Sequence, residues 1–565
     1  MSSLPVPAVE VPQEGRTPTA RPGAAERLPL SVVILARNEE RRIGRCLASV
    51  QWAAELIVVD GMSQDRTKEI CERFGAQVIS HAFEGSFAQE RNLGMERARH
   101  EWVLQLDADD VVTPAFRDAV SRLLAAPQPH DAFKFRRKSY LLGRFMRYGG
   151  WHHYLPNLVR RERVRYEGLV HERPVLQGTI GQLDADVEHH PCESLAGFLD
   201  RHNRYTSLGA MELVARTGPL SERELRARLL GKPRKTFWKT YIKKQGFREG
   251  LHGLVFSLFF AGVELIKWAK VWEHSLAGAQ APQRAAAPSA RPARPQGRET
   301  LSVVLMTKNE EARLAACLDH VGGWADEIVI IDDLSTDRTV EIARGYTDQV
   351  FSFASEDNHD RQWNRGIERA TGEWILHIDA DEVVTPPLRD AIDRRLADAA
   401  GYDAFEMMRK NVFLGRAMRQ GGWYHRHLVL FRRQRARCVG RGIHVRLHVD
   451  GRIGFLDAEI EHHPFSSITQ FIGRQNHYTT VEVQGLRAER GVLPIRAIVY
   501  QLSVRPAKLF WKSYRKNQGR REGLHGLVFG LLYAFVHIML WAKYWELTGA
   551  TPAGHAHASP TPNAS

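Results

Sequence analysis

The chain of 565 residues contains one long sequence unit twice. Leu30-Ser-Val-Val-Ile34 returns as Leu301-Ser-Val-Val-Leu305, and Asp60-Gly-Met-Ser-Gln-Asp-Arg-Thr67 returns as Asp332-Asp-Leu-Ser-Thr-Asp-Arg-Thr339. Three further motifs recur: Gln105-Leu-Asp-Ala-Asp-Asp110 at His377-Ile-Asp-Ala-Asp-Glu382, Gly149-Gly-Trp151 at Gly421-Gly-Trp423, and Glu188-His-His-Pro191 at Glu461-His-His-Pro464. A period of about 270 residues far exceeds the roughly 20–50 residues of solenoid repeats. The duplication therefore predicts two complete domains in tandem.

Composition indicates where the domains begin and end. Residues 277–299 are rich in Ala, Pro, Gln and Arg and have no periodic apolar pattern, which predicts a flexible linker. Residues 1–29 and 549–565 are expected to be disordered tails, and the first of them has no apolar stretch typical of a signal peptide. The predicted globular units are 30–215 and 300–488. Basic and apolar helical parts follow them at 216–276 and 489–548.

Cysteine content favours a reducing compartment. The chain has five cysteines, an odd number, and no Cys-x-x-Cys pair. This pattern is typical of neither a disulfide framework nor a zinc ribbon.

Each unit begins with short apolar runs that alternate with helical patterns. In the first unit we expect strands at Leu30–Leu35, Leu56–Val59 and Trp102–Leu106, and helices at Glu39–Val50, Thr67–Phe74, Phe87–Arg99 and from Pro114 onward. Asn38 is placed to cap the first helix. The alternation predicts an α/β fold with a mostly parallel sheet, and such sheets bind ligands beyond the carboxyl ends of their strands. Asn38, Asp60 and Asp107 should therefore meet at one crevice.

The motif Asp107-Ala-Asp109, which returns as Asp379-Ala-Asp381, follows a buried strand in both units. Mg²⁺ prefers carboxylate oxygens together with substrate phosphates, and such a cation stabilises the charge that develops on a departing diphosphate. Asp-x-Asp also occurs as an ordinary turn or helix cap. Recurrence behind a strand-end aspartate (Asp60, Asp332) favours the metal site. Gly-x-Gly-x-x-Gly and P-loop motifs are missing from the first β–α turn, and no Gly-x-Ser-x-Gly is present, which disfavours dinucleotide, P-loop and hydrolase functions.

At these motifs the chain resembles family 2 glycosyltransferases of the GT-A fold. Within that family it is most similar to the WaaE-like or KdtX-like branch of lipopolysaccharide inner-core glucosyltransferases. The resemblance is based on Val32-Val-Ile-Leu-Ala-Arg-Asn-Glu-Glu40, Val58–Thr67, Gln89-Glu-Arg-Asn92, Leu104–Asp109, Gly149-Gly-Trp151 and Leu169-Val-His-Glu172, and it extends over nearly all of both units.

The resemblance implies roles for individual residues. Asn38 and Glu39 would lie in the nucleotide pocket, Asp60 would bind the uracil or ribose, and Asp107 would touch the ribose or sugar. Arg91 and Asn92 would line the diphosphate-sugar side, and Asp109 would hold Mg²⁺ or Mn²⁺. The second unit offers Asn309, Glu310, Asp332 and Asp379 for the nucleotide-sugar and Asp381 for the metal. Its Arg365 is displaced by two places from the counterpart of Arg91.

An inverting transfer needs a base that takes the proton of the acceptor hydroxyl. Glu172 is the candidate in the first unit. The alternative is that Glu172 only binds the acceptor or forms a surface ion pair. When His171 is aligned with His444, Glu172 is replaced by Val445, so the first unit is favoured as the better enzyme.

The net charge of +14 is concentrated in two stretches. Arg226–Arg248 holds nine Lys and Arg and Arg496–Arg521 holds eight, with no acidic residue in either. Each stretch contains aromatic residues and precedes an apolar run, 251–272 or 524–545, which favours contact with an anionic membrane surface. We expect interfacial or re-entrant helices, with a true span conceivable only at 524–545. Packing of these helices on the globular unit is the alternative. Nucleic acid is disfavoured because the predicted clefts are acidic.

These features together predict a peripheral enzyme on the cytoplasmic face of the inner membrane. Two GT-A units would bind a UDP-sugar, UDP-glucose by the resemblance, and transfer the sugar with inversion to a lipid-linked saccharide such as the lipopolysaccharide inner core. The first alternative is a polyprenyl-phosphate glycosyltransferase. The second is one catalytic unit with a partner unit that only binds the acceptor or the membrane.

Overall fold

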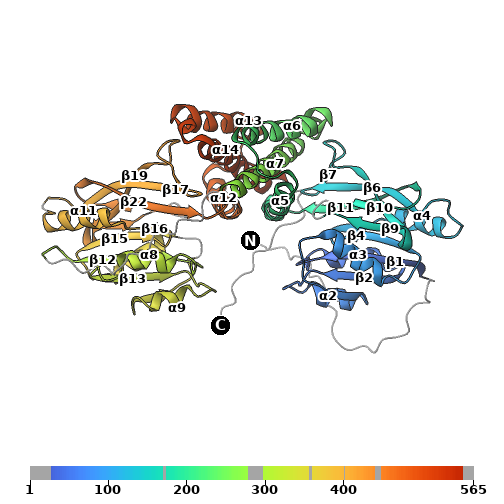
Figure 1. Ribbon diagram of the computed structural model, residues 1–565, viewed down its shortest axis with the longest axis horizontal. Coiled ribbons are helices and arrows are strands. Elements are labelled where there is room, and N and C mark those ends of the chain that lie inside the picture. Colours follow the sequence, from blue (N-terminus) through green and yellow to red (C-terminus); the bar gives the residue numbers. More distant parts are fainter. Residues whose placement is uncertain are drawn as a thin grey trace, which may run out of the picture. The chain divides into compact units, whose positions relative to one another are not determined.

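The computed structural model describes residues 27–168, 173–277, 297–355, 359–399, 401–439 and 447–550. The chain divides into two compact bodies, Met1–Arg137 with Tyr154–His189 and Lys138–His153 with His190–Ser565. The first body contains most of the α/β part of the first repeat. The second body contains the α/β part of the second repeat and the helical parts of both repeats (Figure 1).

The α/β part of the first repeat is a single large sheet flanked by helices. Its elements are β1 (Leu28–Ala36), α1 (Ile43–Ser49), β2 (Ala53–Asp60), α2 (Thr67–Arg73), β3 (Gln77–Ser80), α3 (Phe87–Arg97), β4 (Trp102–Asp107), β5 (Asp110–Val112), α4 (Pro114–Leu124), β6 (Ala132–Leu141), β7 (Arg144–Phe145), β8 (His153–Arg160) and β11 (Ile180–Cys192). The strand order is β3-β2-β1-β4-β8-β6-β11-β5, with β7 paired to β6. A separate hairpin consists of β9 (Val164–Glu167) and β10 (Arg173–Leu176).

The second repeat builds the same sheet. Its elements are β12 (Leu301–Thr307), α8 (Leu314–Val321), β13 (Glu327–Asp332), α9 (Thr339–Arg344), β14 (Val350–Ser352), α10 (His359–Arg369), β15 (Trp374–Asp379), β16 (Glu382–Val383), α11 (Pro386–Ala397), β17 (Ala404–Phe413), β18 (Arg416–Ala417), β19 (His425–Arg432) and β22 (Ile453–Phe465). The order is β14-β13-β12-β15-β19-β17-β22-β16, and β20 (Ala436–Cys438) pairs with β21 (Leu447–Val449).

Strand register places the acidic residues beside one strand end. In the first repeat β1 is parallel to both β2 and β4, with Ala36 opposite Asp60 and Leu35 opposite Asp107. The second repeat repeats this register, because Thr307 lies opposite Asp332 and Met306 opposite Asp379. Neighbouring strands are about 4.8 Å apart, so the two aspartates of each repeat lie on strands separated by about 10 Å. The expectation that these strand ends meet at one crevice is consistent with this register.

One boundary prediction is wrong. Helix α1 begins at Ile43, not at Glu39, and Asn38 does not cap it. Asn38 adopts the left-handed conformation, with a φ of 55°, as does Asn309 with a φ of 52°. The physical reason is that the backbone after β1 is held by hydrogen bonds to the loop after β2, described below, which compete with helix formation.

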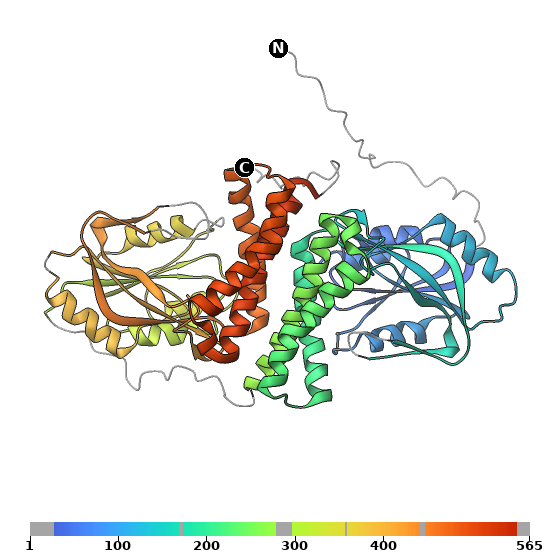
Figure 2. The ribbon, with the colours of Figure 1, turned by 90° about the horizontal axis from the view of Figure 1, so that it is seen from above.

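The helical parts of both repeats form one core inside the second body. They consist of α5 (Leu195–Thr217), α6 (Glu222–Phe237), α7 (Leu251–Ala277), α12 (Ile468–Arg490), α13 (Ile495–Trp511) and α14 (Gly523–Trp545), with the short turns η2 (Trp238–Lys243), η3 (Gly246–Glu249), η5 (Lys512–Lys516) and η6 (Gly519–Glu522). Figure 2 shows the helices of the first repeat (green) beside those of the second (red). The large side chains of α7 and α14, including Phe259, Trp272, Phe535 and Trp545, are buried in this core.

Matching contacts join the helices of the two repeats. The backbone N–H of Ile468 donates to Glu273 (2.9 Å), and the backbone N–H of Leu195 donates to Glu546 (3.0 Å). Glu273 and Glu546 occupy equivalent positions in the duplicated sequence, so the contact is nearly self-complementary, as in a twofold homodimer.

Among the described residues, one helical stretch, Gly519–Gly549, is long and apolar enough to cross a bilayer. More than half of its most apolar segment is buried within the protein, as is usual for a core helix.

Candidate active site

The loops after the first two strands are tied together in the same way in both repeats. The backbone N–H of Asn38 donates to Ser63 (2.8 Å), and the side-chain oxygen of Asn38 accepts from the backbone N–H of Gln64 (2.8 Å). The backbone N–H of Glu39 donates to Thr67 (2.7 Å). Asn309 and Glu310 make the equivalent bonds to Ser335, Thr336 and Thr339. Asn38 and Asn309 thus hold the loop that surrounds the strand-end aspartate.

The strand-end aspartates Asp60 and Asp332 are buried, with only 2% and 1% of their surface exposed. One oxygen of each accepts the backbone N–H of the serine three residues later, at 3.1 Å in both repeats. The other oxygen, Oδ1, has no hydrogen-bond partner in the part of the chain that the structure describes. A buried carboxylate oxygen without a donor is costly, and this cost is relieved when a ligand supplies an N–H or O–H.

Asp107, at the end of β4, is held by two arginines. Its oxygens accept from Arg91 (2.7 Å) and Arg137 (2.6 Å). Burial alone would raise the pKa of Asp107, but the charges of Arg137 and Arg91 outweigh it and hold the pKa well below its ordinary value. Asp107 is therefore a fixed carboxylate at neutral pH.

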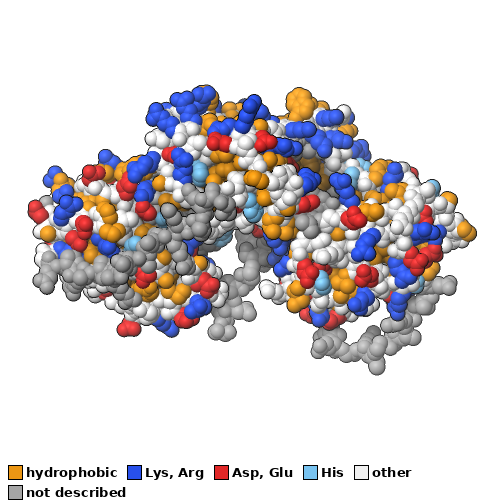
Figure 3. All heavy atoms as spheres, in the orientation of Figure 1, with side chains coloured by type: hydrophobic (Ala, Val, Ile, Leu, Met, Phe, Trp, Pro, Cys, Tyr) orange, Lys and Arg blue, Asp and Glu red, His pale blue; other side chains and the backbone are white. Residues whose placement is uncertain are grey.

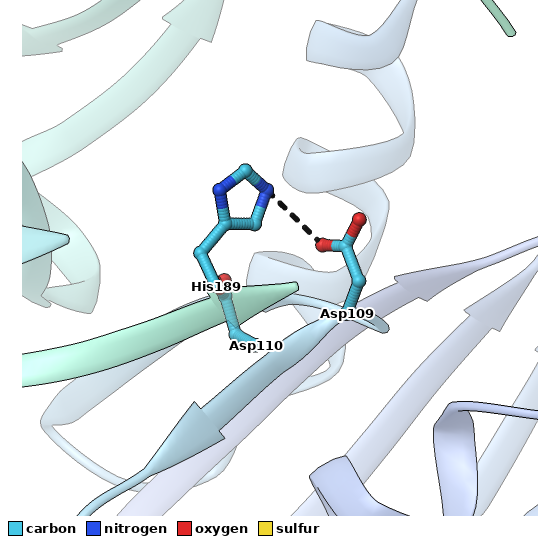
Figure 4. Close-up of side chains that lie close together, drawn as sticks. All are labelled: Asp109, Asp110 and His189. Atoms are coloured by element: carbon cyan, nitrogen blue, oxygen red, sulfur yellow. Dashed lines mark ion pairs between the residues drawn. The ribbon is translucent and has the colours of Figure 1, made fainter. Parts of the chain in front are cut away.

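A compact group of possible metal ligands lies next to Asp107. One possible ligand atom from each of Asp109, Asp110 and His189 lies within 4.8 Å of the other two, and all three residues are buried (Figure 4). The Nε2 atom of His189 is 3.4 Å from an oxygen of Asp109. Asp110 already accepts from Arg137 (2.7 Å) and from the backbone N–H of Asp107 (3.0 Å). Both oxygens of Asp110 thus already accept hydrogen bonds.

The second repeat has the same acidic framework. Asp379 accepts from Arg409 (3.2 Å), which also contacts Glu382 (2.8 Å). Asp381 lies 3.4 Å from Nε2 of His462 and 3.1 Å from Arg474. Burial would raise the pKa of Asp381, but His462 and Arg474 lower it well below its ordinary value. Burial raises the pKa of Glu310, the other partner of Arg474.

Helix α3 of the first repeat and its counterpart α10 of the second carry different side chains toward the site. Arg91 of α3 contacts Asp107 and also donates to Gln105 (3.3 Å). At the matching positions of the second repeat, Trp363 stacks on His377 with ring centroids 4.1 Å apart. The neighbouring asparagine has the same role in both: Asn92 donates to and accepts from the backbone of Tyr166, and Asn364 does so with Cys438.

A cavity of about 940 Å³ lies at the site of the second repeat. Of the residues predicted from sequence, Glu310, Asp379 and Asp381 line it. Asp332 and Asn309 are not among its lining residues. The predicted base Glu172 lies outside the described residues, as do His171, His444 and Val445. The predicted tails and linker lie largely outside them as well.

Arg91 was among the residues predicted from sequence, but sequence reasoning missed the second arginine and the histidine of each site. Arg137 and Arg409 occupy matching positions in the recurring Arg-Lys of β6 and β17, and His189 and His462 belong to the recurring Glu-His-His-Pro motif. Their recurrence in both repeats was the signal that could have identified them. They do not lie at the ends of the first parallel strands, so the argument from strand ends did not find them.

Comparison with known proteins agrees with this geometry. The sequence profile of glycosyl transferase family 2 matches residues 31–172 and 302–448, one segment in each repeat. The chain therefore belongs to glycosyl transferase family 2, as a tandem duplicate with two GT-A α/β domains.

Individual relatives correspond in length to one repeat. A lipopolysaccharide core biosynthesis glycosyltransferase, LpsC of Rhizobium meliloti (strain 1021), is 27% identical over 267 residues, which cover 44% of this chain and 94% of LpsC. An uncharacterized glycosyltransferase of Rickettsia conorii is 24% identical over 261 residues, covering 44% of this chain and 91% of the relative.

Solved structures with similarity to the chain include two nucleotide complexes. Residues 1–349 of S. aureus TarS with UDP-GlcNAc have a TM-score of 0.24 at 15% identity, covering 44% of this chain and 92% of TarS. Glucosyl-3-phosphoglycerate synthase from Mycobacterium tuberculosis with Mg²⁺ and UDP has a TM-score of 0.24 at 19% identity, covering 35% of this chain and 81% of the synthase.

Proposed function

We propose that this glycosyltransferase transfers glucose from UDP-glucose, with inversion, to a lipid-linked saccharide of the lipopolysaccharide core. The proposal depends mainly on the buried Oδ1 atoms of Asp60 and Asp332, which lack a hydrogen-bond donor. The N–H of uracil or a ribose hydroxyl would supply that donor. The name of the Rhizobium relative supports the acceptor class.

The donor set of the first repeat fits a divalent cation such as Mn²⁺ or Mg²⁺. Asp109, the ligand predicted from sequence, would hold the ion together with His189 beside it. When bound, the ion would neutralise the charge of the departing UDP. Arg137 would hold Asp107 and Asp110 in place beside it.

The acceptor hydroxyl must lose a proton as it attacks the anomeric carbon. Glu172, which lies outside the described residues, remains the candidate base for the first repeat. A carboxylate within about 3 Å of the hydroxyl would perform this step.

The helical core offers a face suited to an anionic membrane on the cytoplasmic side. Trp238, at the end of α6, is 63% exposed, and Trp511, at the end of α13, is 62% exposed. Lys and Arg side chains surround apolar ones over α6 and α13 (Figure 3). Basic side chains beside exposed tryptophan favour the surface of anionic lipids, at about 1 kcal/mol per cation.

The test is transfer from a panel of UDP-sugars by the full chain, with Mn²⁺ or with EDTA. Asp109→Asn and Asp381→Asn, made separately and together, assign activity to each repeat. We expect UDP-glucose to be preferred, EDTA to abolish transfer, and the double variant to be inactive.

Two outcomes would contradict the proposal or part of it. Transfer that is unaffected in the double variant would remove the acidic sites from the mechanism. Full activity in Asp381→Asn together with none in Asp109→Asn would favour the alternative in which the second repeat only binds. Core saccharide and polyprenyl phosphate, offered as separate acceptors, distinguish the two acceptor classes.

A further inference from the structure

The cavity of the second repeat extends beyond the acidic site. One end is lined by Asp379, Asp381 and Arg409, and the other by residues of the helical core. Leu509 of α13 and Val536 and Leu540 of α14 belong to this second end, which we call the apolar arm. All of these residues belong to the second body. The same cavity therefore has a charged part and an aliphatic part.

The chemistry of the apolar arm suits hydrocarbon better than sugar. Its aliphatic side chains offer no hydrogen bonds, so saccharide hydroxyls placed there would lose those they make with water. Hydrocarbon would gain about 25 cal/mol for each Å² removed from water. Phe529 and Trp423, stacked with ring centroids 4.5 Å apart, line the cavity as well.

Polar side chains also line the helical side of the cavity: Gln475, His477, Tyr478, Thr479, Glu482, Tyr533 and His537. His537 contacts Gln501 of α13 at 3.0 Å, and burial lowers the pKa of His537 to about 4, so the ring is neutral at pH 7. Apart from the aliphatic residues of the arm, the wall therefore has polar side chains from α12 and α14, and the proposal concerns only the part lined by Leu509, Val536 and Leu540. Tyr533 is 50% exposed, so one lining residue of the cavity is in contact with solvent.

The first repeat differs at the matching helix positions. Where α14 has His537 and Leu540, α7 has Glu264 and Lys267, which form an ion pair at 2.7 Å. The two helices share the following Trp-Ala-Lys, and Ala261 and Val263 of α7 return as Ala534 and Val536 of α14. The first repeat thus has charged side chains where the second has part of the apolar arm, so the shared helical fold does not require apolar residues at these positions.

We propose that the apolar arm binds the hydrocarbon part of the lipid-linked acceptor while the acceptor's reacting group lies at the acidic end of the same cavity. This inference rests on the proposed transferase function. The hydrocarbon can come from the acyl chains of a lipid A-linked saccharide or from a polyprenyl chain. Both supply the same aliphatic surface.

The test transfers the first repeat's ion pair into the arm, as His537→Glu with Leu540→Lys. Because α7 carries this pair at the same positions, we expect the variant to fold. Transfer is measured in the Asp109→Asn background, so that only the second repeat acts. The acceptors are lipid A-linked core, the same core after deacylation, and polyprenyl phosphate. We expect the KM of the matching lipid acceptor to rise at least tenfold and that of the deacylated core to be unchanged.

Lipid binding tests the same inference without a measurement of transferase activity. Dansyl-labelled lipid A and dansyl-labelled decaprenyl phosphate are titrated into the full chain, and UDP is titrated separately. We expect the variant to lose at least tenfold affinity for one of the two lipids while UDP affinity is unchanged. The control variant, Val492→Glu with Ile495→Lys, adds the same charges at positions that are 75% and 64% exposed.

Three results would overturn the inference. One is unchanged binding of both lipids in the variant, and another is an equal loss of lipid binding in the control variant. The third is an equal rise in KM for acylated and deacylated core, which would assign the cavity to saccharide. Absence of all transfer in the native chain would instead contradict the proposed function, and the lipid titration would still decide the role of the arm.

Discussion

At the scale of single residues, the acidic site depends on one arginine. Arg137 donates to Asp107 (2.6 Å) and Asp110 (2.7 Å) and lies 3.6 Å from Asp109. Asp109 and Asp110 are buried and Asp107 is partly exposed, and repulsion among the three carboxylates favours uptake of a proton. The charge of Arg137 lowers the pKa of Asp107 and opposes the rise that burial causes in the pKa of Asp110.

Replacing Arg137 by Met should therefore damage both activity and stability. We expect kcat/KM of the first repeat to fall at least tenfold, measured in the Asp381→Asn background. We also expect the free energy of unfolding to fall by about 3 kcal/mol, because a buried charge cluster loses its partner. Thermal denaturation and a UDP-sugar transfer assay check the two effects.

The neighbouring residue provides the control. Arg136 pairs with Asp186 (2.7 Å) and Asp184 (3.1 Å) on the more exposed side of β6. Arg136→Met should cost less than about 1 kcal/mol. Equal losses in the two variants would show that Arg137 has no special role.

At the scale of elements, the helices of the two repeats meet closely at one glycine. A β-carbon placed on Gly262 of α7 would lie 2.0 Å from the ring of Phe535 of α14. Gly262 and Phe535 occupy equivalent positions of the duplicated sequence. The two helices can therefore pack this closely only because α7 has glycine at this position, which leaves room for the phenylalanine ring of α14.

Gly262→Leu should separate these helices. We expect a loss of about 3 kcal/mol in the stability of the helical core, since overpacking forces the backbone to move. Gly231 of α6, whose added β-carbon would meet nothing within 4 Å, is the matched control. Gly231→Ala should be neutral or stabilise by up to about 1 kcal/mol. Circular dichroism at 222 nm during heating measures both, and a stable Gly262→Leu variant would contradict the packing.

Two buried lysines make the same core sensitive to pH. The amine of Lys270 contacts Asn203, Thr206 and Ser207, and that of Lys543 makes equivalent contacts. Burial lowers the pKa of each to about 7, although Glu273 and Glu546 respectively oppose this shift. In the unfolded chain the value is about 10.4. Between these values the unfolded chain binds protons that the folded chain does not, so stability rises with pH.

The double variant Lys270→Met with Lys543→Met isolates this effect. From pH 7 to pH 9.5 the native chain should gain on the order of 2 kcal/mol per lysine relative to the variant. Unfolding free energies at a series of pH values measure the difference. Lys267→Met, which removes a partly exposed lysine of the same helix, should follow the native profile. Parallel profiles for the native chain and the double variant would contradict the shifted pKa values.

At the scale of the whole molecule, different helices of the helical core form its interior and its exposed basic surface. Its long apolar helices α7 and α14 are mostly internal, while α6 and α13 present tryptophan and basic side chains to the solvent. We therefore expect membrane contact to depend on the ends of α6 and α13 and not on insertion of the apolar helices.

Trp238→Ser with Trp511→Ser tests this expectation. We expect at least a fivefold weaker association with vesicles of phosphatidylglycerol and phosphatidylcholine, measured by sedimentation, with UDP binding unchanged. Association should also weaken as salt is raised, because exposed charges are screened. Tyr154→Ser, at a residue that is 42% exposed in the first body, is the control and should bind vesicles as the native chain does.

Much of the fold was predictable from short-range pattern. Apolar runs such as Leu56–Val59 identified buried strands, and Pro114 correctly marked the start of α4. The start of α1 was not predictable in this way, because Asn38 is held by Ser63 and Gln64 of another loop and no local propensity reports that contact. The same limit applies to the site: Asp60 and Asp107 follow from their strand ends, whereas Arg137 and His189 come from distant strands.

By itself, the sequence determined the duplication, the alternation of strands and helices, and the family of the chain, since repeated motifs and hydrophobic period are properties of the linear order. Only the tertiary structure decided that the apolar segments α7 and α14 pack together as one core. Composition cannot distinguish a helix buried in protein from one at a membrane, because both environments favour the same apolar side chains. The structure alone also joined the acidic end and the apolar arm in one cavity, since its walls come from residues far apart in the chain.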